Sequence, residues 1–239
     1  MLELKNVSFE VNTDQGKKTI IDNISLTIKE KFVAFTGHNG GGKSTLAKLV
    51  MGLYQPTSGQ ILFDGVDITN MSITDRANLG IGYAFQSPVK FKGITVSDLV
   101  SLASGKRLNV SEICGYLSEV GLCARDYVDR EVNSELSGGE LKRIEIACAM
   151  ARSAKLTLFD EPEAGIDLWS FNSLISVFEK LEKQTNGSII IISHQERILN
   201  MVERIIVVTN GKIDRDGAKE EILPNLLYSN VCKTLTDKM

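Results

Sequence analysis

A glycine-rich loop constrains this chain more than any other feature of its sequence. Gly37–Thr45 follows the apolar run Phe32–Phe35 and opens a helix-like stretch that ends at Gly52. Gly37 and Gly42 let the backbone adopt conformations that a Cβ atom forbids, so successive N–H groups can point at one anion. The helix that follows adds the positive end of its dipole. A strand, a glycine loop and a helix in this order predict a phosphate-binding loop.

The side chains of this loop narrow the expected ligand to a nucleoside triphosphate with magnesium. Lys43 can reach the β- and γ-phosphates, and the hydroxyl of Ser44 can ligate Mg²⁺. The alternative is a glycine-rich turn without a ligand, and the complete G-x-x-x-x-G-K-S pattern argues against it. The predicted nucleotide-binding residues of the loop are Gly37, His38, Asn39, Gly40, Gly41, Gly42, Lys43, Ser44 and Thr45.

Length and composition exclude several classes of protein. The 239 residues suit one α/β domain with or without an inserted subdomain, and 43% of them are apolar, enough for a sizeable core. No apolar run approaches the roughly 20 residues that a membrane span requires, and no basic, apolar leader opens the chain. The net charge of −3 leaves no general footprint for DNA or RNA. We therefore expect a cytoplasmic protein without a nucleic-acid partner.

Hydrophobic patterning divides the chain into a core and an insertion. Leu2–Val11 and Ile20–Ile28 alternate apolar and polar residues, which predicts an antiparallel strand pair ahead of the loop. After Pro88 the spacing becomes helical, and strand-like runs resume at Leu156. The predicted parts are therefore a nucleotide-binding α/β core with an antiparallel β subdomain at 1–86 and 155–217, an inserted helical subdomain at 87–154, and an unassigned tail at 218–239.

Four apolar runs each end directly in residues of phosphate or metal chemistry. The four ends are Gly37, Gln86, Asp160-Glu161 and His194. In parallel α/β sheets, ligands bind at the carboxyl ends of the strands. We therefore expect these side chains, although far apart in sequence, to converge on one nucleotide.

Each of these residues has a predicted role. Ser44, Gln86 and Asp160 are candidate magnesium ligands, because a charge at the end of a buried strand needs a partner. Glu161 points differently from its neighbour and can address the attacking water, and His194 can donate to the γ-phosphate or hold Glu161 and its water. Asp-Glu pairs and single glutamines are common on surfaces, so their place at strand ends is what supports these roles.

A second anion cradle is predicted far from the first. Ser137, Gly138, Gly139 and Glu140 precede an amphipathic helix, and a serine with two glycines at a helix start offers a hydroxyl and N–H groups. The alternative is an ordinary N-cap. Two cradles beside a single set of hydrolytic groups need an explanation.

The motifs taken together resemble the ATP-binding cassette ATPases. The resemblance rests on Gly37–Thr45, Gln86, Leu136–Glu140, Leu158–Glu161, Ala164–Asp167 and His194. It implies an α/β fold with a P-loop (RecA-like) parallel-sheet core, an N-terminal antiparallel β subdomain and an inserted α-helical subdomain. It also implies Mg-ATP hydrolysis in an ATP-dependent, head-to-tail homodimer.

In such a dimer, one subunit's signature motif closes over the ATP held by the other. The resemblance assigns this partner-subunit contact to Ser137, Gly138, Gly139 and Glu140, and communication across the dimer to Asp167. Most cassettes stack adenine on an aromatic residue near position 11. Here Val11 stands at that place, which implies weaker recognition of the base.

Two subfamilies compete for the identity of the partner. Residues 83–89, 137–146 and 193–199 are similar to the ATPase of the Suf iron–sulfur cluster assembly system (SufC-like), which implies a soluble Suf-type scaffold partner. Gly37–Gly40 with 44–49 instead resembles energy-coupling-factor importers, which implies a transmembrane importer subunit and a peripheral place at the membrane. A third reading, a regulator that binds nucleotide without hydrolysis, is disfavoured by intact Glu161 and His194.

The partner is expected to dock on the inserted region. Family members use the part of this region that corresponds to 91–102 for that purpose. An apolar patch is predicted there from Phe91, Ile94, Val96 and Leu99, with internal packing as the alternative.

Overall fold

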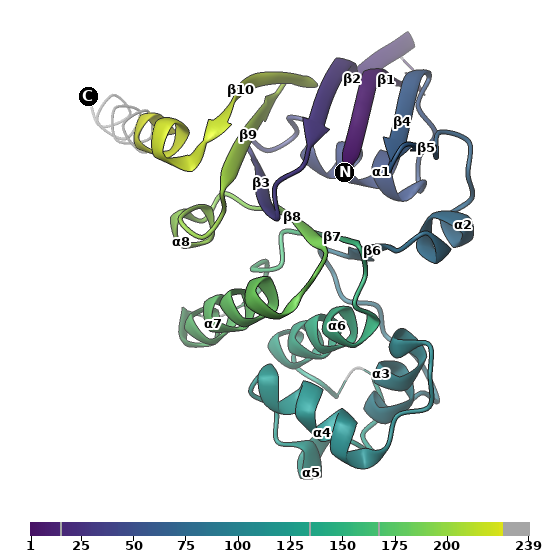
Figure 1. The fold of residues 1–239 in the computed structure, drawn as a ribbon, viewed down its shortest axis with the longest axis vertical. Helices are drawn as coiled ribbons and strands as arrows, with labels where there is room; N and C mark the ends of the chain where they lie inside the picture. Colours follow the sequence, from purple (N-terminus) through teal and green to yellow (C-terminus); the bar gives the residue numbers. More distant parts are fainter. Residues whose placement is uncertain (15, 134, 167, 227–239) are drawn as a thin grey trace. The chain divides into compact units, whose positions relative to one another are not determined.

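The computed structural model describes residues 1–14, 16–133, 135–166 and 168–226 (Figure 1). The chain forms two compact units. The first unit comprises Met1–Arg76 and the chain from Ile190 onward, and the second comprises Ala77–Ile189. Helix α2 (Ile73–Asn78) leads from the first unit into the second, and strand β8 (Ser188–Ile192) leads back.

An antiparallel sheet in the order β2-β1-β4-β5 belongs to the first unit (Figure 1). Its strands are β1 (Leu2–Thr13), β2 (Gly16–Ile28), β4 (Ser58–Phe63) and β5 (Val66–Asp67). Leu2 lies opposite Ile28 on one side and Phe63 on the other. All three side chains are buried, as period-two patterning requires of a sheet with one covered face. The predicted antiparallel strand pair is confirmed, and both strands reach nearer the turn than predicted.

The core strands of the first unit have the order β10-β9-β3. β3 (Phe32–Thr36) is buried along its whole length and runs parallel to β9 (Arg204–Thr209). β9 pairs antiparallel with β10 (Lys212–Ala218) across the Asn210-Gly211 turn, the hairpin that such a dipeptide favours. Beyond it residues 219–226 are helical, so part of the tail left unassigned by the sequence has regular structure.

Helix α1 (Lys43–Met51) follows β3, and a buried arginine secures its C-terminal end. The guanidinium of Arg76 donates to the carbonyls of Leu49 and Val50 at 2.6 and 2.9 Å, and further to Thr69 and Met71. Carbonyls in the last turn of a helix lack the usual partner four residues on, although that of Leu49 also accepts from the C-cap N–H of Gly52. A cation complements the negative end of the dipole. Burial lowers the pKa of Arg76, and its carbonyl partners offset the cost of that burial.

The second unit contains a parallel strand pair and most of the helices. β6 (Ile81–Ala84) pairs with β7 (Leu156–Asp160). Its helices are α3 (Val96–Ser104), α4 (Val110–Glu119), α5 (Ala124–Tyr127), α6 (Gly138–Arg152) and α7 (Leu168–Gln184). Helix α8 (Glu196–Leu199) lies in the first unit. The helical character predicted for 87–154 is therefore confirmed, while the predicted domain boundaries remain a prediction.

Helix α6 is the centre of the helical part, because both α3 and α4 pack against it. Its apolar side chains Leu141, Ile144 and Ala147 are buried. Within the ranges that the structure describes, no helix combines the length and the apolar character needed to cross a membrane.

Candidate nucleotide-binding site

The phosphate loop connects β3 to α1 with glycines at positions where other residues do not fit. A Cβ atom on Gly37 would lie 2.2 Å from the carbonyl oxygen of Val208, and the residue has φ +126°. Gly42 has φ +107°, and a Cβ there would lie 2.8 Å from Cδ1 of Ile21. Both conditions exclude side chains. The loop can therefore approach β9 and β2 closely while its backbone curls into a concave shape.

Lys43 places a buried cation inside this loop. Its side chain is buried, and Nζ donates to the carbonyls of Gly37 and His38 at 2.8 and 2.9 Å. Gly42, the N-cap of α1, supplies no side-chain hydrogen bond to the helix. A cation, glycine N–H groups and a helix start without a side-chain cap all favour a polyphosphate, so the residues present fit the predicted ligand.

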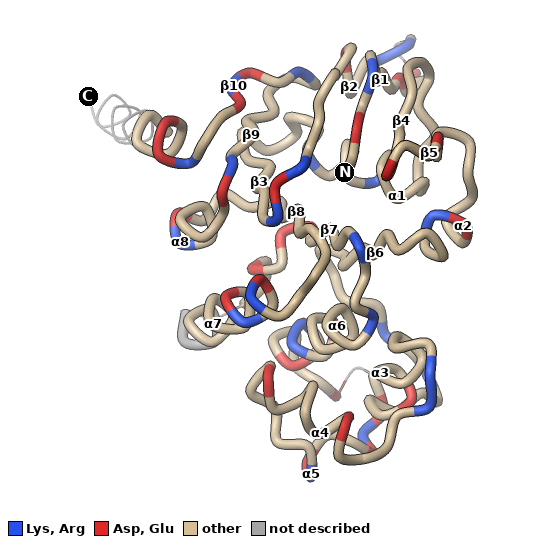
Figure 2. Tube along the Cα trace, viewed as in Figure 1, with Lys and Arg blue, Asp and Glu red and all other residues tan. Residues whose placement is uncertain are grey.

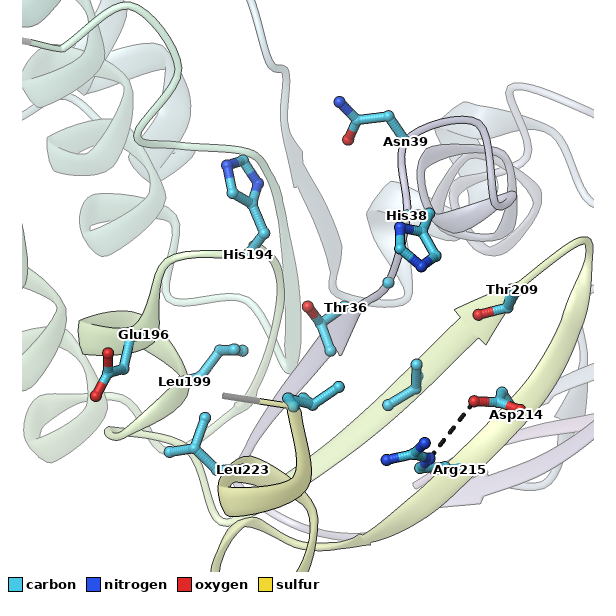
Figure 3. A pocket seen from close by; sticks show the side chains of 13 residues that line it. Thr36, His38, Asn39, His194, Glu196, Leu199, Thr209, Asp214, Arg215 and Leu223 are labelled. Atoms are coloured by element: carbon cyan, nitrogen blue, oxygen red, sulfur yellow. Dashed lines mark ion pairs between the residues drawn. The ribbon is translucent and has the colours of Figure 1, made fainter. Parts of the chain in front are cut away.

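His194 lies on the same side of the first unit as the start of the loop. Together with His38 and Asn39 it lines a cavity of about 710 Å³, shown in Figure 3. The other walls come from the end of β3, from α8, β9 and β10, and from the helix at 219–226, through residues such as Leu199, Thr209 and Leu223. His194 follows β8 directly after Ser193, whose N–H bonds the carbonyl of Phe35. The predicted meeting of His194 with the phosphate loop therefore occurs within one unit.

A second group of predicted residues meets in the other unit. Asp160 ends β7 and is 3% exposed, and its Oδ2 accepts a 2.7 Å hydrogen bond from the hydroxyl of Tyr83. The amide of Gln86 donates to Oε2 of Glu161 at 2.5 Å. Glu161 has φ +45°, in the left-handed region that a non-glycine residue adopts only when its surroundings hold it there. Strain of this kind, at a carboxylate predicted to be catalytic, fits a functional site.

Ser137 is the N-cap of α6 in a complete capping box. Its hydroxyl accepts from the N–H of Glu140 at 3.2 Å, and Glu140 Oε2 accepts from the N–H of Ser137 at 2.7 Å. The other carboxylate oxygen accepts from the Tyr127 hydroxyl and lies 3.8 Å from the guanidinium of Arg130. The Tyr127 hydrogen bond is the main cause that lowers the pKa of Glu140, so this carboxylate is ionised at neutral pH.

The structure brings the predicted residues together as two sets. Gly37–Thr45 and His194 belong to the first unit, whereas Gln86, Asp160-Glu161 and Ser137–Glu140 belong to the second. Convergence of all of them on one nucleotide remains a prediction. Val11 lies on β1 opposite Lys18, and Asp167 lies outside the described residues.

Sequence reasoning missed three residues that contact the second set. Tyr83 belongs to an apolar run and to the 83–89 stretch and has no predicted role of its own, although a half-buried tyrosine hydroxyl favours a hydrogen-bond partner. Lys142 and Glu145 form a 2.8 Å ion pair and both contact the backbone of Phe85. Their opposite charges three positions apart on a predicted helix were a detectable signal.

Comparison with known proteins identifies the class of fold and then the family. The fold matches that of a dimeric ATP-binding cassette in a post-hydrolysis state bound to ADP and Pi, with a TM-score of 0.81, 24% identity, and coverage of 92% of this chain and 99% of that one. The family model described as "ABC transporter" matches residues 21–164. The chain therefore belongs to the ABC transporter family.

Curated relatives support the same assignment over nearly the full length. An uncharacterized ABC transporter ATP-binding protein of Methanocaldococcus jannaschii is 36% identical, with 89% of this chain and 88% of the relative covered. An energy-coupling factor transporter ATP-binding protein of Mycoplasma mobile is 32% identical, with 98% and 85% covered. As a member of this family, the chain is an ATPase that uses Mg-ATP.

These comparisons correct one expectation from the sequence. The names of the relatives describe transporter ATP-binding proteins, and neither mentions iron–sulfur cluster assembly. The SufC-like specificity expected from residues 83–89, 137–146 and 193–199 is therefore not supported. The importer alternative, expected from Gly37–Gly40, agrees better with the relatives.

Proposed function

We propose that this chain is the ATP-hydrolysing subunit of a membrane importer, peripheral at the cytoplasmic face and active as a head-to-tail homodimer. The observation that carries the dimer is the environment of Gly138 and Gly139 at the start of α6. A Cβ atom on either residue would meet nothing within 4 Å, and neither has a positive φ. The chain's own packing gives no reason for glycine there. A triphosphate approaching from another subunit would supply that reason.

The two sets of residues have different proposed roles in binding and hydrolysing ATP. The N–H groups of Gly37–Thr45 and the ammonium of Lys43 would bind the triphosphate, and Val11 would lie near the base. Mg²⁺ would be held by Ser44, Gln86 and Asp160, and would neutralise charge on the β- and γ-phosphates. Glu161 would accept a proton from the attacking water, and His194 would orient the γ-phosphate. Ser137–Glu140 would complete the site of the opposite subunit, and Asp167 would communicate between the two.

An ATP-trapped dimer tests this proposal. Glu161→Gln should bind ATP without consuming it, so that saturating Mg-ATP holds two chains together. Gly138→Trp in the same background should abolish the dimer and leave ATP binding by the monomer unchanged. Size exclusion with light scattering measures both species. A Glu161→Gln chain that stays monomeric at saturating Mg-ATP, alone and with its transmembrane partner, would contradict the head-to-tail homodimer.

The helical part offers a docking surface for the membrane subunit. A groove of about 640 Å³ is lined by Ile94, Asp98, Ser101, Leu102, Gly105, Lys106 and Arg107. Leu102 lines this groove and is 67% exposed, so it offers apolar surface that a partner could bury. Of the four residues predicted for an apolar patch, Ile94 alone lines this groove. Val96 is fully buried and packs internally, and Phe91 and Leu99 are half-buried outside the groove. Leu102→Asp should weaken capture of the partner without changing ATP affinity, because the groove lies in the helical part and the phosphate loop lies in the other unit.

A soluble Suf-type scaffold is the second candidate partner, favoured by the three sequence stretches named above. A pull-down from cytosolic and detergent-solubilised membrane fractions, read by mass spectrometry, separates the two candidates. Stoichiometric recovery of an integral membrane protein supports the importer. A soluble partner recovered without any membrane protein would overturn it in favour of cluster assembly.

A further inference from the structure

An ion pair on α6, formed by buried Lys142 and by Glu145 with a side chain 18% exposed, holds the residue that precedes Gln86. Lys142 Nζ donates to the carbonyl of Phe85, and its side chain is only 2% exposed. Glu145, one helical turn further along α6, holds the other backbone group of Phe85, because its Oε1 accepts from the N–H of Phe85 at 2.9 Å. Its Oε2 accepts from Lys142 Nζ at 2.8 Å. Both backbone polar groups of one residue are thus held by two side chains of a single helix, which carries charges of both signs along its length (Figure 2).

The next residue passes this constraint to the predicted catalytic carboxylate. Lys142 Nζ also lies 3.5 Å from the carbonyl of Gln86, and the Gln86 amide donates to Glu161. All of these residues belong to the second unit. A continuous path of contacts therefore runs from α6 through Phe85 and Gln86 to Glu161.

Stability alone is a weak reason for such a pair. Two charges taken out of water lose hydration, and replacement of a buried ion pair by apolar side chains of similar size is often neutral or stabilising. Burial raises the pKa of Glu145, and the charge of Lys142 opposes that rise. The pair does, however, specify the position of Phe85 more narrowly than apolar packing would, because hydrogen bonds fix both distance and direction.

We propose that Lys142 and Glu145 are positioning residues for hydrolysis, which hold Phe85 so that the side chain of Gln86 can orient Glu161. This inference rests on the roles proposed above for Gln86 and Glu161. Helix α6 begins in the Ser137 cradle that would receive the partner subunit's triphosphate. A shift of α6 when the partner's triphosphate fills that cradle would therefore move Gln86 and Glu161 of the same chain. These two residues would serve the other ATP site of the dimer, the one formed on this chain's own phosphate loop.

A graded pair of variants tests the role. In Lys142→Met/Glu145→Met both contacts to Phe85 are lost, and no unpaired buried charge remains. In Lys142→Met/Glu145→Gln the amide oxygen can still accept from the N–H of Phe85, so one contact is kept. The matched control is Lys180→Met/Glu119→Gln, which removes the exposed 3.0 Å ion pair of the same unit. The measurements are thermal unfolding, ATP affinity without Mg²⁺, and kcat as a function of Mg²⁺ concentration.

The expected result separates positioning from folding. The Met/Met variant should unfold at the parent's temperature and bind ATP equally well, because the phosphate loop lies in the other unit. Its kcat should fall, or its Mg²⁺ requirement should rise, by about 10- to 100-fold, the range typical of lost outer-shell contacts. The Met/Gln variant should lie between it and the parent, and the control should match the parent. If the Met/Met chain does not fold, the comparison of Met/Gln with the parent carries the same test.

Two outcomes would overturn the inference in distinguishable ways. Parent-like kcat and Mg²⁺ dependence in the Met/Met variant, or in Met/Gln if Met/Met does not fold, while Gln86→Ala is slow, would remove Lys142 and Glu145 from the mechanism and leave the proposed site intact. Parent-like activity of Gln86→Ala itself would remove Gln86 from the site, and the positioning role would fall with it.

Discussion

The amide of Gln86 donates a 2.5 Å hydrogen bond to the carboxylate of Glu161, 75 positions further along the chain. The contact joins the second residue after β6 to the first residue after β7, and the two strands run parallel, so their carboxyl ends lie at the same edge. An amide on one oxygen orients the carboxylate and leaves its charge in place. A general base needs both properties.

Glu161→Gln should lower kcat for ATP hydrolysis by at least about 10²-fold, the scale of a lost general base. ATP binding should be retained, because the phosphate loop and Lys43 belong to the first unit. Steady-state phosphate release and equilibrium nucleotide binding measure the two effects. Glu179→Gln, at an exposed position of α7, is the charge-matched control. Equal turnover in Glu161→Gln and the parent would remove Glu161 from the mechanism.

Tyr83→Phe should alter the handling of magnesium. The hydroxyl of Tyr83 orients the buried carboxylate of Asp160, a predicted Mg²⁺ ligand. Loss of an outer-shell hydrogen bond typically weakens metal binding or activity by about 10- to 100-fold, so half-maximal activity should require about tenfold more Mg²⁺. Tyr116→Phe on α4 makes the same chemical change elsewhere in the unit. An unaltered Mg²⁺ titration would mean that Asp160 is held in place without this hydroxyl.

Arg130 should matter for the ATP-dependent dimer only while Glu140 is charged. Glu140 puts a negative charge into a cradle proposed for a triphosphate, and Arg130 lies 3.8 Å from it. Arg130→Ala should therefore weaken the dimer in the parent and have little effect in a Glu140→Gln background. Light scattering across an ATP titration of the four chains forms a double-mutant cycle. Equal losses in both backgrounds would show that Arg130 acts independently of Glu140.

The pKa of Glu140 sets the pH range of that comparison. Because the folded pKa is lowered, mainly by the Tyr127 hydroxyl, the ionised form is favoured by folding. The stability that this carboxylate contributes is present above its unfolded pKa and is lost as pH falls through the folded pKa. The cycle should therefore be measured near neutral pH, where the carboxylate is ionised.

Substitution of two glycines should have opposite consequences for stability. Gly37→Ala places a Cβ 2.2 Å from a backbone oxygen at φ +126°, so the chain should lose several kcal/mol of unfolding free energy, about 3 or more, and ATP binding with it. Gly138→Ala meets open space in the first turn of a helix, so its stability should equal the parent's or rise by up to about 1 kcal/mol. Chemical denaturation measures both. A Gly37→Ala chain as stable as the parent would contradict the close approach to Val208.

The sequence was sufficient wherever local conformation decides structure. Gly37 to Ser44 predicts the phosphate loop because glycine conformations and the following helix are set by neighbouring residues. Alternation in Leu2–Val11 predicts a strand because period two leaves one face to bury. Ser137 predicts the start of α6, since an N-cap hydrogen bond spans only a few positions of the chain. The ends of the predicted strands likewise indicated the candidate site residues Gln86, Asp160-Glu161 and His194.

Only the tertiary structure decided which distant residues meet. Tyr83 on Asp160, Gln86 on Glu161, and Lys142 with Glu145 on Phe85 all depend on which strands pair and on where α6 packs. Such pairings depend on the total apolar surface buried across the whole core. A short stretch of sequence does not determine that total, because the contributing residues are far apart in the chain. Val96 illustrates the reverse limit: apolar spacing left both a surface patch and internal packing open, and the packing of its helix buries it completely.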